Sequence, residues 1–497
     1  MIKSMSNYIL TIDQGTTSSR VALINSQGQW LADGQRPFRQ FYPQPGWVEH
    51  DAEEIWQSVL DSLKECLQNA QVQTSDIKTI GITNQRETVL MWDRKTGKPL
   101  HPAIVWQCRR TQDLCEKLKR QKKEKIFKSK AGLVLDPYFS GTKIKWLLDK
   151  VPGARKRAEA GEIAVGTIDS WLLWKLTGGR AHRTDVSNAS RTLLMNLKTL
   201  DWDPELLKIL QVPPQILPEI LATNALFGQT LKVPGLPDGL PIHAMIGDQQ
   251  SALFGQNCFR PGEAKCTFGT GSFLLLNIGN APKPSRSGCL TTVAWKLNHQ
   301  KAVYAYEGSA FICGAAVQWL RDGLGLFEKS SDVEALAASV PSSEGVEFVP
   351  ALTGLGAPHW RPEARGVITG LTRGTTKAHI ARATLEAMAL QNADLLLAMK
   401  KDIGRPLRKV RVDGGASRNN LLMQIQADYL DLVVERPRVF ETTALGAALM
   451  AGLGAGLFKD LSEIEKVWQK DTEFQPKMKA TARKLRQQHW LKAVERA

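Results

Sequence analysis

Short apolar runs alternate along this chain with turn residues and with stretches of helical periodicity. Residues 8–12 and 21–25 are apolar and flank a polar turn, which predicts two strands joined by a hairpin. Residues 51–68 carry apolar side chains at helical spacing, so we expect an amphipathic helix there. Further strands are expected over 77–83 and 88–92. Strands and helices that alternate in this way predict an α/β fold.

A second opening of the same kind begins about half a chain later. Residues 264–268 (AKCTF) read as a strand, a Gly/Thr/Ser turn follows, and residues 273–278 are mostly apolar again. The repetition predicts two similarly built domains with a boundary near residues 256–262. We therefore expect one domain over residues 1–257 and another over residues 258–497.

The last third of the chain has a different pattern. A long helix is predicted over 379–401, and a strand is predicted over 410–412. The strand runs directly into the Gly-Gly turn of residues 413–417.

Composition limits the class of protein. The chain has 497 residues, of which 43% are apolar and 23% charged, as in a globular protein with more than one core. No apolar stretch approaches the roughly 18 residues that a membrane span needs. Residues 1–7 lack the apolar segment of an export signal, and the seven cysteines show no C-x-x-C spacing. We expect a cytoplasmic protein with reduced thiols and no stable membrane insertion.

The net charge of +16 is the one unusual bulk property. Basic residues concentrate in two runs, 117–130 and 477–496. Neither run is interleaved with the aromatic residues that stack on single-stranded nucleic acid, so solvated helical faces are the favoured interpretation and we expect no nucleic-acid partner. A nucleic-acid binder is the alternative, and it predicts salt-dependent retention on DNA.

Two polar turns have the composition of phosphate sites. Residues 13–20 (DQGTTSSR) and 269–272 (GTGS) combine glycine, which brings backbone N–H groups close to an anion, with hydroxyls that donate to phosphate oxygens. Arg20 adds positive charge, and Asp13 at the strand end could hold a hydrated Mg²⁺. Ordinary hairpins are the alternative interpretation. Together, the turns suggest two hairpins that face one polyphosphate from opposite domains.

Three further stretches carry candidate chemistry. In residues 413–420 a strand enters a Gly-Gly turn before a helix, as at nucleotide sites of α/β sheets, although Walker and Rossmann motifs are missing. Asp248 precedes a helical stretch, where it either caps the helix or accepts a proton from a hydroxyl. Arg86 and Glu87 either bind a polyol or form a surface ion pair.

Over nearly its whole length, from residue 8 to about residue 456, the sequence resembles the FGGY carbohydrate kinase family. The resemblance is carried by residues 13–20, 84–87, 106–111, 138–150, 247–250 and 366–386. Lys150, at the end of one signature, departs from the usual residue types. The resemblance implies two actin-like ATPase (ribonuclease H-like) domains around a central cleft, with ATP and Mg²⁺ clamped between them. Homo-oligomers, dimers or tetramers, are also implied.

The resemblance further implies that glycerol is phosphorylated to sn-glycerol 3-phosphate, with Asp248 as the base. The residues implied to bind the triol are Arg86, Glu87, Tyr138, Asp248 and Gln249, with Trp106 and Phe273 as walls. Those implied to meet the phosphates are Thr16, Thr17, Ser18, Arg20 and Thr270. Those implied to hold the nucleoside are Gly314, Gln318, Gly415 and Asn419. Asp13 remains the candidate metal ligand from its place at the strand end.

Two alternative functions remain possible at this point. A kinase of the same family that acts on xylulose or gluconate would share the hairpins but need a roomier pocket. A non-catalytic actin-like or chaperone-like ATPase would share the hairpins without a polyol pocket. The motifs around Arg86 and Trp106 argue against the sugar kinases, because a five- or six-carbon sugar needs more room than two aromatic walls leave. The set formed by Arg86, Glu87 and Asp248 argues against the non-catalytic ATPase.

Overall fold

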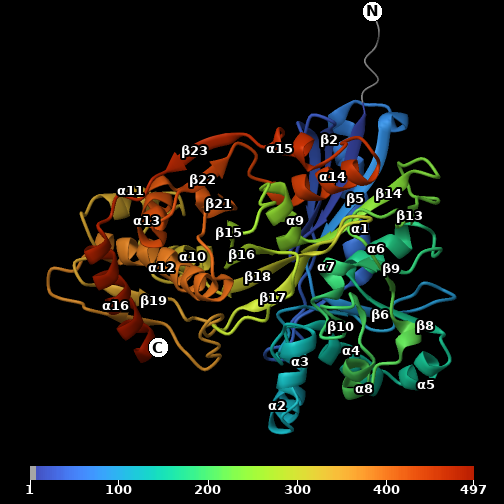
Figure 1. Ribbon diagram of the computed structural model, residues 1–497, viewed down its shortest axis with the longest axis horizontal. Helices are drawn as coiled ribbons and strands as arrows, with labels where there is room; N and C mark the ends of the chain where they lie inside the picture. The colour runs from blue at the N-terminus through green and yellow to red at the C-terminus, as the bar shows by residue number, and fades with distance from the viewer. Residues whose placement is uncertain (1–6) are drawn as a thin grey trace, which may run out of the picture.

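Two large β-sheets organise the computed structural model, which describes residues 7–497 (Figure 1). Residues 1–6, on which much of the expectation about an export signal depends, lie outside this range. We call residues up to 257 the N-terminal half and the remainder the C-terminal half. The six-stranded sheet of the N-terminal half has the order β13 (Gly228–Gln229), β14 (Pro241–Gly247), β5 (Ile77–Asn84), β1 (Tyr8–Gln14), β2 (Ser18–Asn25) and β3 (Trp30–Pro37).

The first sheet forms as the apolar pattern predicts. Strands β1 and β2 make an antiparallel hairpin, and β5 and β14 continue the sheet in parallel beyond β1. Helix α1 (Ala52–Ala70) covers one face with Ile55, Val59 and Leu63 buried. Asp51 caps this helix by accepting hydrogen bonds from the backbone N–H groups of residues 53 and 54.

The second sheet repeats this path. Its seven strands have the order β17 (Leu290–Trp295), β18 (Val303–Ala310), β16 (Ser272–Gly279), β15 (Glu263–Phe268), β21 (Lys409–Asp413), β22 (Val434–Pro437) and β23 (Lys470–Phe474). Strands β15 and β16 form the antiparallel hairpin, and β21 and β22 follow in parallel beyond β15. The predicted second opening is therefore confirmed, together with the strand over 410–412 and the long helix, observed as α12 (Lys377–Ile403).

A smaller four-stranded sheet completes the N-terminal half, with the order β4 (Glu49–His50), β7 (Ala103–Ile104), β6 (Val89–Asp93) and β8 (Ile163–Thr167). The strand predicted over 88–92 exists as β6, but it belongs to this sheet and not to the central one. Two-stranded ribbons pair β10 (Met195–Asn196) with β11 (Asp201–Trp202), β9 (Arg183–Asp185) with β12 (Glu219–Leu221) and β19 (Glu347–Val349) with β20 (Val367–Thr369).

The remaining helices surround these sheets (Figure 1). In the N-terminal half they are η1 (Thr74–Asp76), α2 (Gln112–Arg120), α3 (Glu124–Lys130), α4 (Ser140–Lys150), α5 (Ala154–Glu159), α6 (Ile168–Leu176), α7 (Val186–Ala189), α8 (Pro204–Leu210), η2 (Pro214–Ile216) and α9 (Asp248–Gly255). In the C-terminal half they are α10 (Gly314–Asp322), α11 (Asp332–Ala338), η3 (Gly415–Arg418), α13 (Asn420–Leu430), α14 (Thr442–Gly454), α15 (Leu461–Glu465) and α16 (Ala480–Arg496).

Helix α14 connects the two halves. Although it follows β22 in the sequence, it packs against β1, β5 and β14 of the first sheet and against α9. Small residues permit this approach: a Cβ at Gly446 would lie 1.9 Å from the carbonyl oxygen of Ser251, and one at Gly81 would lie 2.4 Å from that of Ala447. Apolar side chains from both halves share the core around this helix, including Ile246, Leu253 and Leu449.

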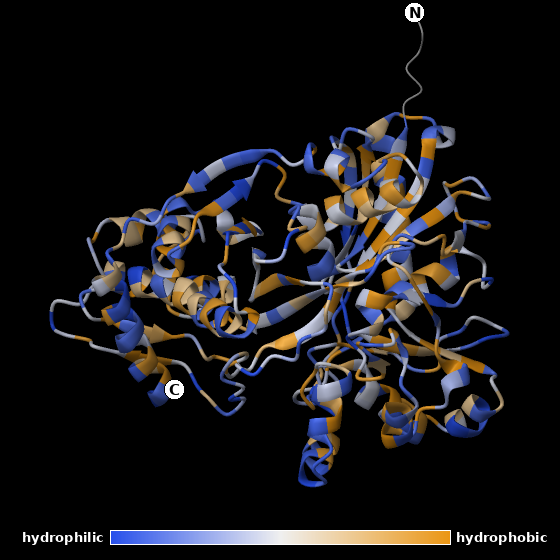
Figure 2. Cartoon of the chain, viewed as in Figure 1, coloured by the Kyte–Doolittle hydropathy of each residue, from blue (hydrophilic) through white to orange (hydrophobic). Residues whose placement is uncertain are grey.

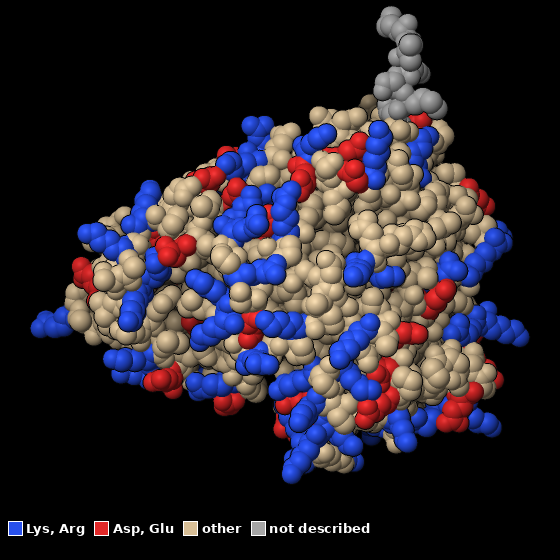
Figure 3. Space-filling model, in the orientation of Figure 1, with Lys and Arg blue, Asp and Glu red and all other residues tan. Residues whose placement is uncertain are grey.

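Polar and apolar residues are separated as expected for a folded globular chain, with apolar residues concentrated in the strands and the helices packed on them (Figure 2). The predicted basic runs are helical: the first spans α2 and α3, and the second α16. Lys and Arg side chains crowd the projecting end formed by α2 and α3 (Figure 3). Within residues 7–497, no helix is both long and apolar enough to cross a membrane.

Candidate active site

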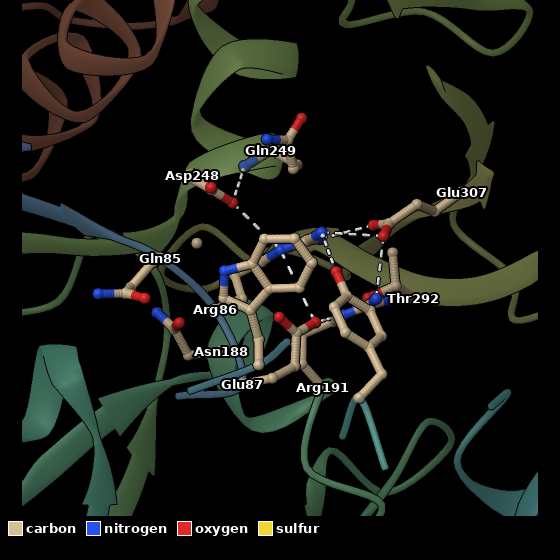
Figure 4. A network of polar contacts seen from close by, with 12 residues as sticks. Gln85, Arg86, Glu87, Asn188, Arg191, Asp248, Gln249, Thr292 and Glu307 are labelled. Atoms are coloured by element: carbon tan, nitrogen blue, oxygen red, sulfur yellow. Dashed lines mark hydrogen bonds and ion pairs between the residues drawn. The ribbon is translucent and has the colours of Figure 1, made fainter. Parts of the chain in front are cut away.

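Arg86 and Glu87 follow the end of β5 after one intervening residue and are buried, and Figure 4 shows the polar contacts around them. Each side chain is 1% exposed, so the surface ion-pair interpretation is wrong. Arg86 Nε lies 3.2 Å from Asp248 Oδ1, and Arg86 Nη2 donates to Tyr138 Oη over 3.4 Å. Four residues that are far apart in the sequence, Arg86, Glu87, Tyr138 and Asp248, are thus brought together.

Asp248 is the first residue of α9, and Gly247 is the N-cap. Its Oδ1 accepts from the backbone N–H of the adjacent residue, Gln249, at 2.6 Å. The side chain is 29% exposed, whereas its partner Arg86 is buried. The carboxylate is therefore oriented by an arginine and still accessible, as a general base must be.

Two aromatic rings lie beside this group. Trp106 and Tyr138 pack edge to face with ring centroids 5.5 Å apart. Trp106 Nε1 donates to Thr16 Oγ1 over 3.0 Å, which joins the aromatic pair to the first hairpin. Burial raises the pKa of Tyr138, so its hydroxyl stays protonated at neutral pH. Phe273 lies on β16 next to the second hairpin and is half-buried.

The first hairpin is closed by a hydrogen bond from Gly15 N to Ser18 O at 2.9 Å. Thr17 is exposed at its tip, with Thr16 and Ser18 half-buried. Arg20 is already engaged, because its Nη1 lies 2.6 Å from Glu441 Oε2 of the C-terminal half. The tip of the hairpin thus exposes hydroxyls and backbone groups to a ligand. The salt bridge of Arg20 holds the strand below the tip against the other half.

The second hairpin is supported from behind by the start of α10. Cys313 N donates to Thr270 O at 2.8 Å, and Gly314 N donates to Gly269 O at 2.9 Å. A Cβ at Gly314 would lie 2.6 Å from Gly269 O, so only glycine permits this contact. Thr270 stays exposed, with its hydroxyl available to a ligand.

The turn after β21 also meets the second hairpin. Gly414 has φ 83°, and a Cβ there would lie 2.5 Å from the carbonyl oxygen of Phe268. Gly415 beyond it is exposed. Asn419 caps α13 by accepting from Leu422 N at 2.8 Å, and Gln318 is exposed on α10. The predicted nucleoside residues therefore come from the surroundings of the second hairpin, although Asn419 also has a capping role.

Asp13 is the next-to-last residue of β1, and its carboxylate is within electrostatic reach of Asp248. Burial raises the pKa of Asp13 to about 7; Arg20 opposes the shift, and the carboxylates of Asp248 and Glu441 add to it. A bound cation would relieve this repulsion. Within the described residues, no three His, Cys, Asp or Glu side chains form a metal cluster. Asp13 and Asp248 fit Mg²⁺, which keeps several waters and uses one or two carboxylates together with substrate phosphates.

Family comparison matches the N-terminal domain of the FGGY family of carbohydrate kinases to residues 8–255 and the C-terminal domain to residues 264–455. This chain belongs to the FGGY family of carbohydrate kinases. Its fold is the two-domain α/β fold of these kinases, with the actin-like architecture that the resemblance implied.

Individual FGGY relatives match over the full length. The chain is 64% identical over 492 residues to a glycerol kinase of Bdellovibrio bacteriovorus, with 99% of each chain covered. It is 56% identical to a glycerol kinase of Deinococcus radiodurans, covering 99% of this chain and 97% of that one. The crystal structure of Plasmodium falciparum glycerol kinase with ADP superposes with a TM-score of 0.92 at 38% identity, covering 99% of this chain and 98% of that chain.

Sequence reasoning missed three buried charged residues of this FGGY site: Arg191, Lys265 and Glu307. Lys265 Nζ donates to Gln249 Oε1 and, over 2.8 Å, to Thr267 Oγ1. Burial lowers the pKa of Lys265. Glu307 is the single charged residue of strand β18, whereas Lys265 shares strand β15 with Glu263. An isolated charge in a buried strand was the available signal, because such a charge needs a partner.

Proposed function

We propose that this chain transfers the γ-phosphoryl group of Mg-ATP to glycerol, giving sn-glycerol 3-phosphate and ADP. The observation that carries the proposal is the accessible Asp248 carboxylate, 3.2 Å from Arg86 Nε and grouped with Glu87 and Tyr138. Full-length relatives that are 52–64% identical are named glycerol kinases, which supports this choice among FGGY substrates.

Glycerol has three hydroxyls and no charge, so recognition must come from paired hydrogen bonds. Arg86 supplies donors, Glu87 supplies acceptors, and the neutral Tyr138 hydroxyl supplies either. Gln249 adds an amide beside Asp248, while Trp106 and Phe273 contact the carbon backbone. A substrate that leaves one of these buried polar groups unpaired is rejected more strongly than one that merely differs in apolar size.

Asp248 takes the proton from the attacking hydroxyl as phosphoryl transfer proceeds. The transition state is loose, so positioning and charge neutralisation contribute more than covalent assistance. The phosphates lie between the hairpins, against Thr16, Thr17, Ser18 and Arg20 on one side and Thr270 on the other. The nucleoside lies against Gly314, Gln318, Gly415 and Asn419. When bound near Asp13, Mg²⁺ supplies charge neutralisation of the phosphate oxygens.

Two parts of the proposal lie outside the site itself. We place the reaction in the cytoplasm on the sequence pattern and the cysteine spacing, and we expect a homo-oligomer on the family resemblance.

Gluconate and xylulose kinases share this fold, with TM-scores of 0.88 and 0.87 at 23% identity, and such similarity shows the fold alone. An ADP-release assay across glycerol, dihydroxyacetone, xylulose and gluconate tests the substrate. We expect the highest kcat/KM for glycerol. A higher value for xylulose or gluconate would reassign the substrate within the family. ADP release that no acceptor stimulates would instead indicate a conformational ATPase.

A further inference from the structure

Glu307 is a single acidic residue in the middle of the buried strand β18. Both of its carboxylate oxygens contact the N-terminal half: Oε2 lies 2.5 Å from Arg86 Nη1, while Oε1 accepts from Arg86 Nη2 and from Arg191 Nη2, each at 2.9 Å (Figure 4). Burial by itself would raise the pKa of Glu307, but Arg191 and Arg86 lower it to about 2. The carboxylate is therefore ionised and shared between two arginines.

Arg191 completes a buried cluster of four charges. It follows α7, and its Nε donates to Glu87 Oε1 at 2.7 Å. The cluster of Arg86, Glu87, Arg191 and Glu307 contains two positive and two negative groups, and each residue is at most 2% exposed. Removing one member would leave an uncompensated charge in the interior, which is far more costly than losing an exposed salt bridge.

The backbone at Glu87 is strained. Its φ is 62°, in the left-handed region that glutamate rarely adopts, and Thr88 N donates to Arg86 O at 2.7 Å across it. This is a three-residue γ-turn of the rarer, strained form. Such a conformation persists only where surrounding contacts over-determine it. Here the two side chains of the turn, Arg86 and Glu87, are held by Glu307 and Arg191.

Strand β18 also leads to the second hairpin. Glu307 is opposite Leu275 of β16, the strand that leaves this hairpin. Just beyond β18, Cys313 N donates to Thr270 O at 2.8 Å. Strand β18 therefore connects the carboxylate that holds the strained turn with the hairpin that is predicted to meet the phosphates.

We propose that Glu307 and Arg191 are positioning residues, which hold the Arg86–Glu87 turn in the shape that accepts glycerol and couple this pocket to the nucleotide-binding half. The inference rests on the proposed function. On this inference the cluster does more than stabilise the fold. Glycerol should bind more tightly when nucleotide is present, and this gain in affinity should depend on Glu307.

Glu307→Gln tests the assignment, with Glu307→Asp as the conservative variant. The matched control is Glu435→Gln, because Glu435 is also a buried glutamate of the second sheet, paired with an arginine, Arg411, at 3.0 Å. The measurements are KM for glycerol, KM for ATP and kcat, and the Kd of glycerol with and without a non-hydrolysable ATP analogue. A melting curve for each variant establishes that it is folded.

We expect Glu307→Gln to raise the KM of glycerol roughly 10- to 100-fold, the range for a lost hydrogen bond to a charged group. The KM of ATP should change much less. The analogue should no longer tighten glycerol binding, and Glu307→Asp should recover part of the loss. Glu435→Gln should keep wild-type values for all of these quantities.

A folded Glu307→Gln variant with wild-type glycerol KM and intact coupling would overturn the inference. So would equal effects in the Glu435→Gln control. If Glu307→Gln does not fold, Arg191→Lys takes its place, because lysine keeps the charge but cannot bridge Glu87 and Glu307 as the guanidinium does. An inactive wild type would remove the proposed function together with this inference. An active wild type with an unaffected variant would remove the inference alone.

Discussion

Asp248 is distinguished from a helix-capping aspartate by its surroundings. Its carboxylate is accessible and paired with buried Arg86, whereas Asp51 accepts the two N–H groups of a true cap. Asp248→Asn keeps the shape of the side chain but cannot take a proton. We expect kcat to fall by about 10²–10⁴-fold, the usual contribution of a general base, while the Kd of glycerol stays close to that of the wild type.

Asp51→Ala is the control for this prediction, measured in the same kinetic and calorimetric assays. It should lower stability by about 1 kcal/mol through the lost cap and leave kcat unchanged. A near wild-type kcat in Asp248→Asn would assign Asp248 a structural role instead.

Single residues of the site were predictable to different degrees. Arg86, Glu87 and Asp248 lie in short motifs of typical composition, so the sequence was sufficient to select them. Arg191 and Glu307 were not selected, because their role in the site depends on contacts with residues 104 to 221 positions away in the sequence. Likewise, nothing local indicates that Glu87 adopts a positive φ.

At the scale of elements, periodicity predicted most helices and strands near the site, including α1, α12 and both hairpins. Pairing between elements was less predictable. Strand β6 has a strand-like composition, but whether it joins the central sheet depends on long-range contacts with β8 and β7. Helix α14 packs on the sheet of the other half because Gly446 and Gly81 permit close approach, which local patterns do not reveal.

The packing of β6, β8 and α6 contains a neutral histidine, His182. It lies against Trp92 and Trp174, its Nδ1 is 3.1 Å from Arg94 Nη2, and its Nε2 is 3.0 Å from Val165 O. Burial, together with Arg94, lowers the pKa of His182 to about 3. In the unfolded chain this pKa returns to about 6.5. Stability from this group is therefore fully present above pH 6.5 and decreases as the pH falls towards 3.

At pH 5 the loss from His182 amounts to about 2 kcal/mol. Melting temperatures between pH 7.5 and pH 5 measure it. His182→Gln should melt lower at pH 7.5 because packing is lost, but its melting temperature should decrease less on acidification. An identical pH dependence in wild type and variant would contradict a histidine that is neutral in the folded protein.

At the scale of the whole molecule, three ion pairs join the halves around the site: Arg20 with Glu441, and Glu307 with both Arg86 and Arg191. The two predicted phosphate hairpins belong to different halves and must converge on one ATP. We therefore expect ligands to favour a closed arrangement, which also excludes water as a competing phosphoryl acceptor.

Small-angle X-ray scattering tests this expectation. The radius of gyration should decrease when glycerol and a non-hydrolysable ATP analogue are both added, with each ligand alone as the control. An unchanged radius under saturating ligands would count against convergence of the halves.

The central claim is that this site transfers a phosphoryl group to one end of glycerol. Its most direct measurement is the product itself: a known amount of Mg-ATP is consumed with excess glycerol, and the product is quantified with a dehydrogenase specific for sn-glycerol 3-phosphate. We predict one equivalent of that isomer for each ADP formed. ADP formed without the phosphorylated triol, or with a mixture of its isomers, would contradict the account.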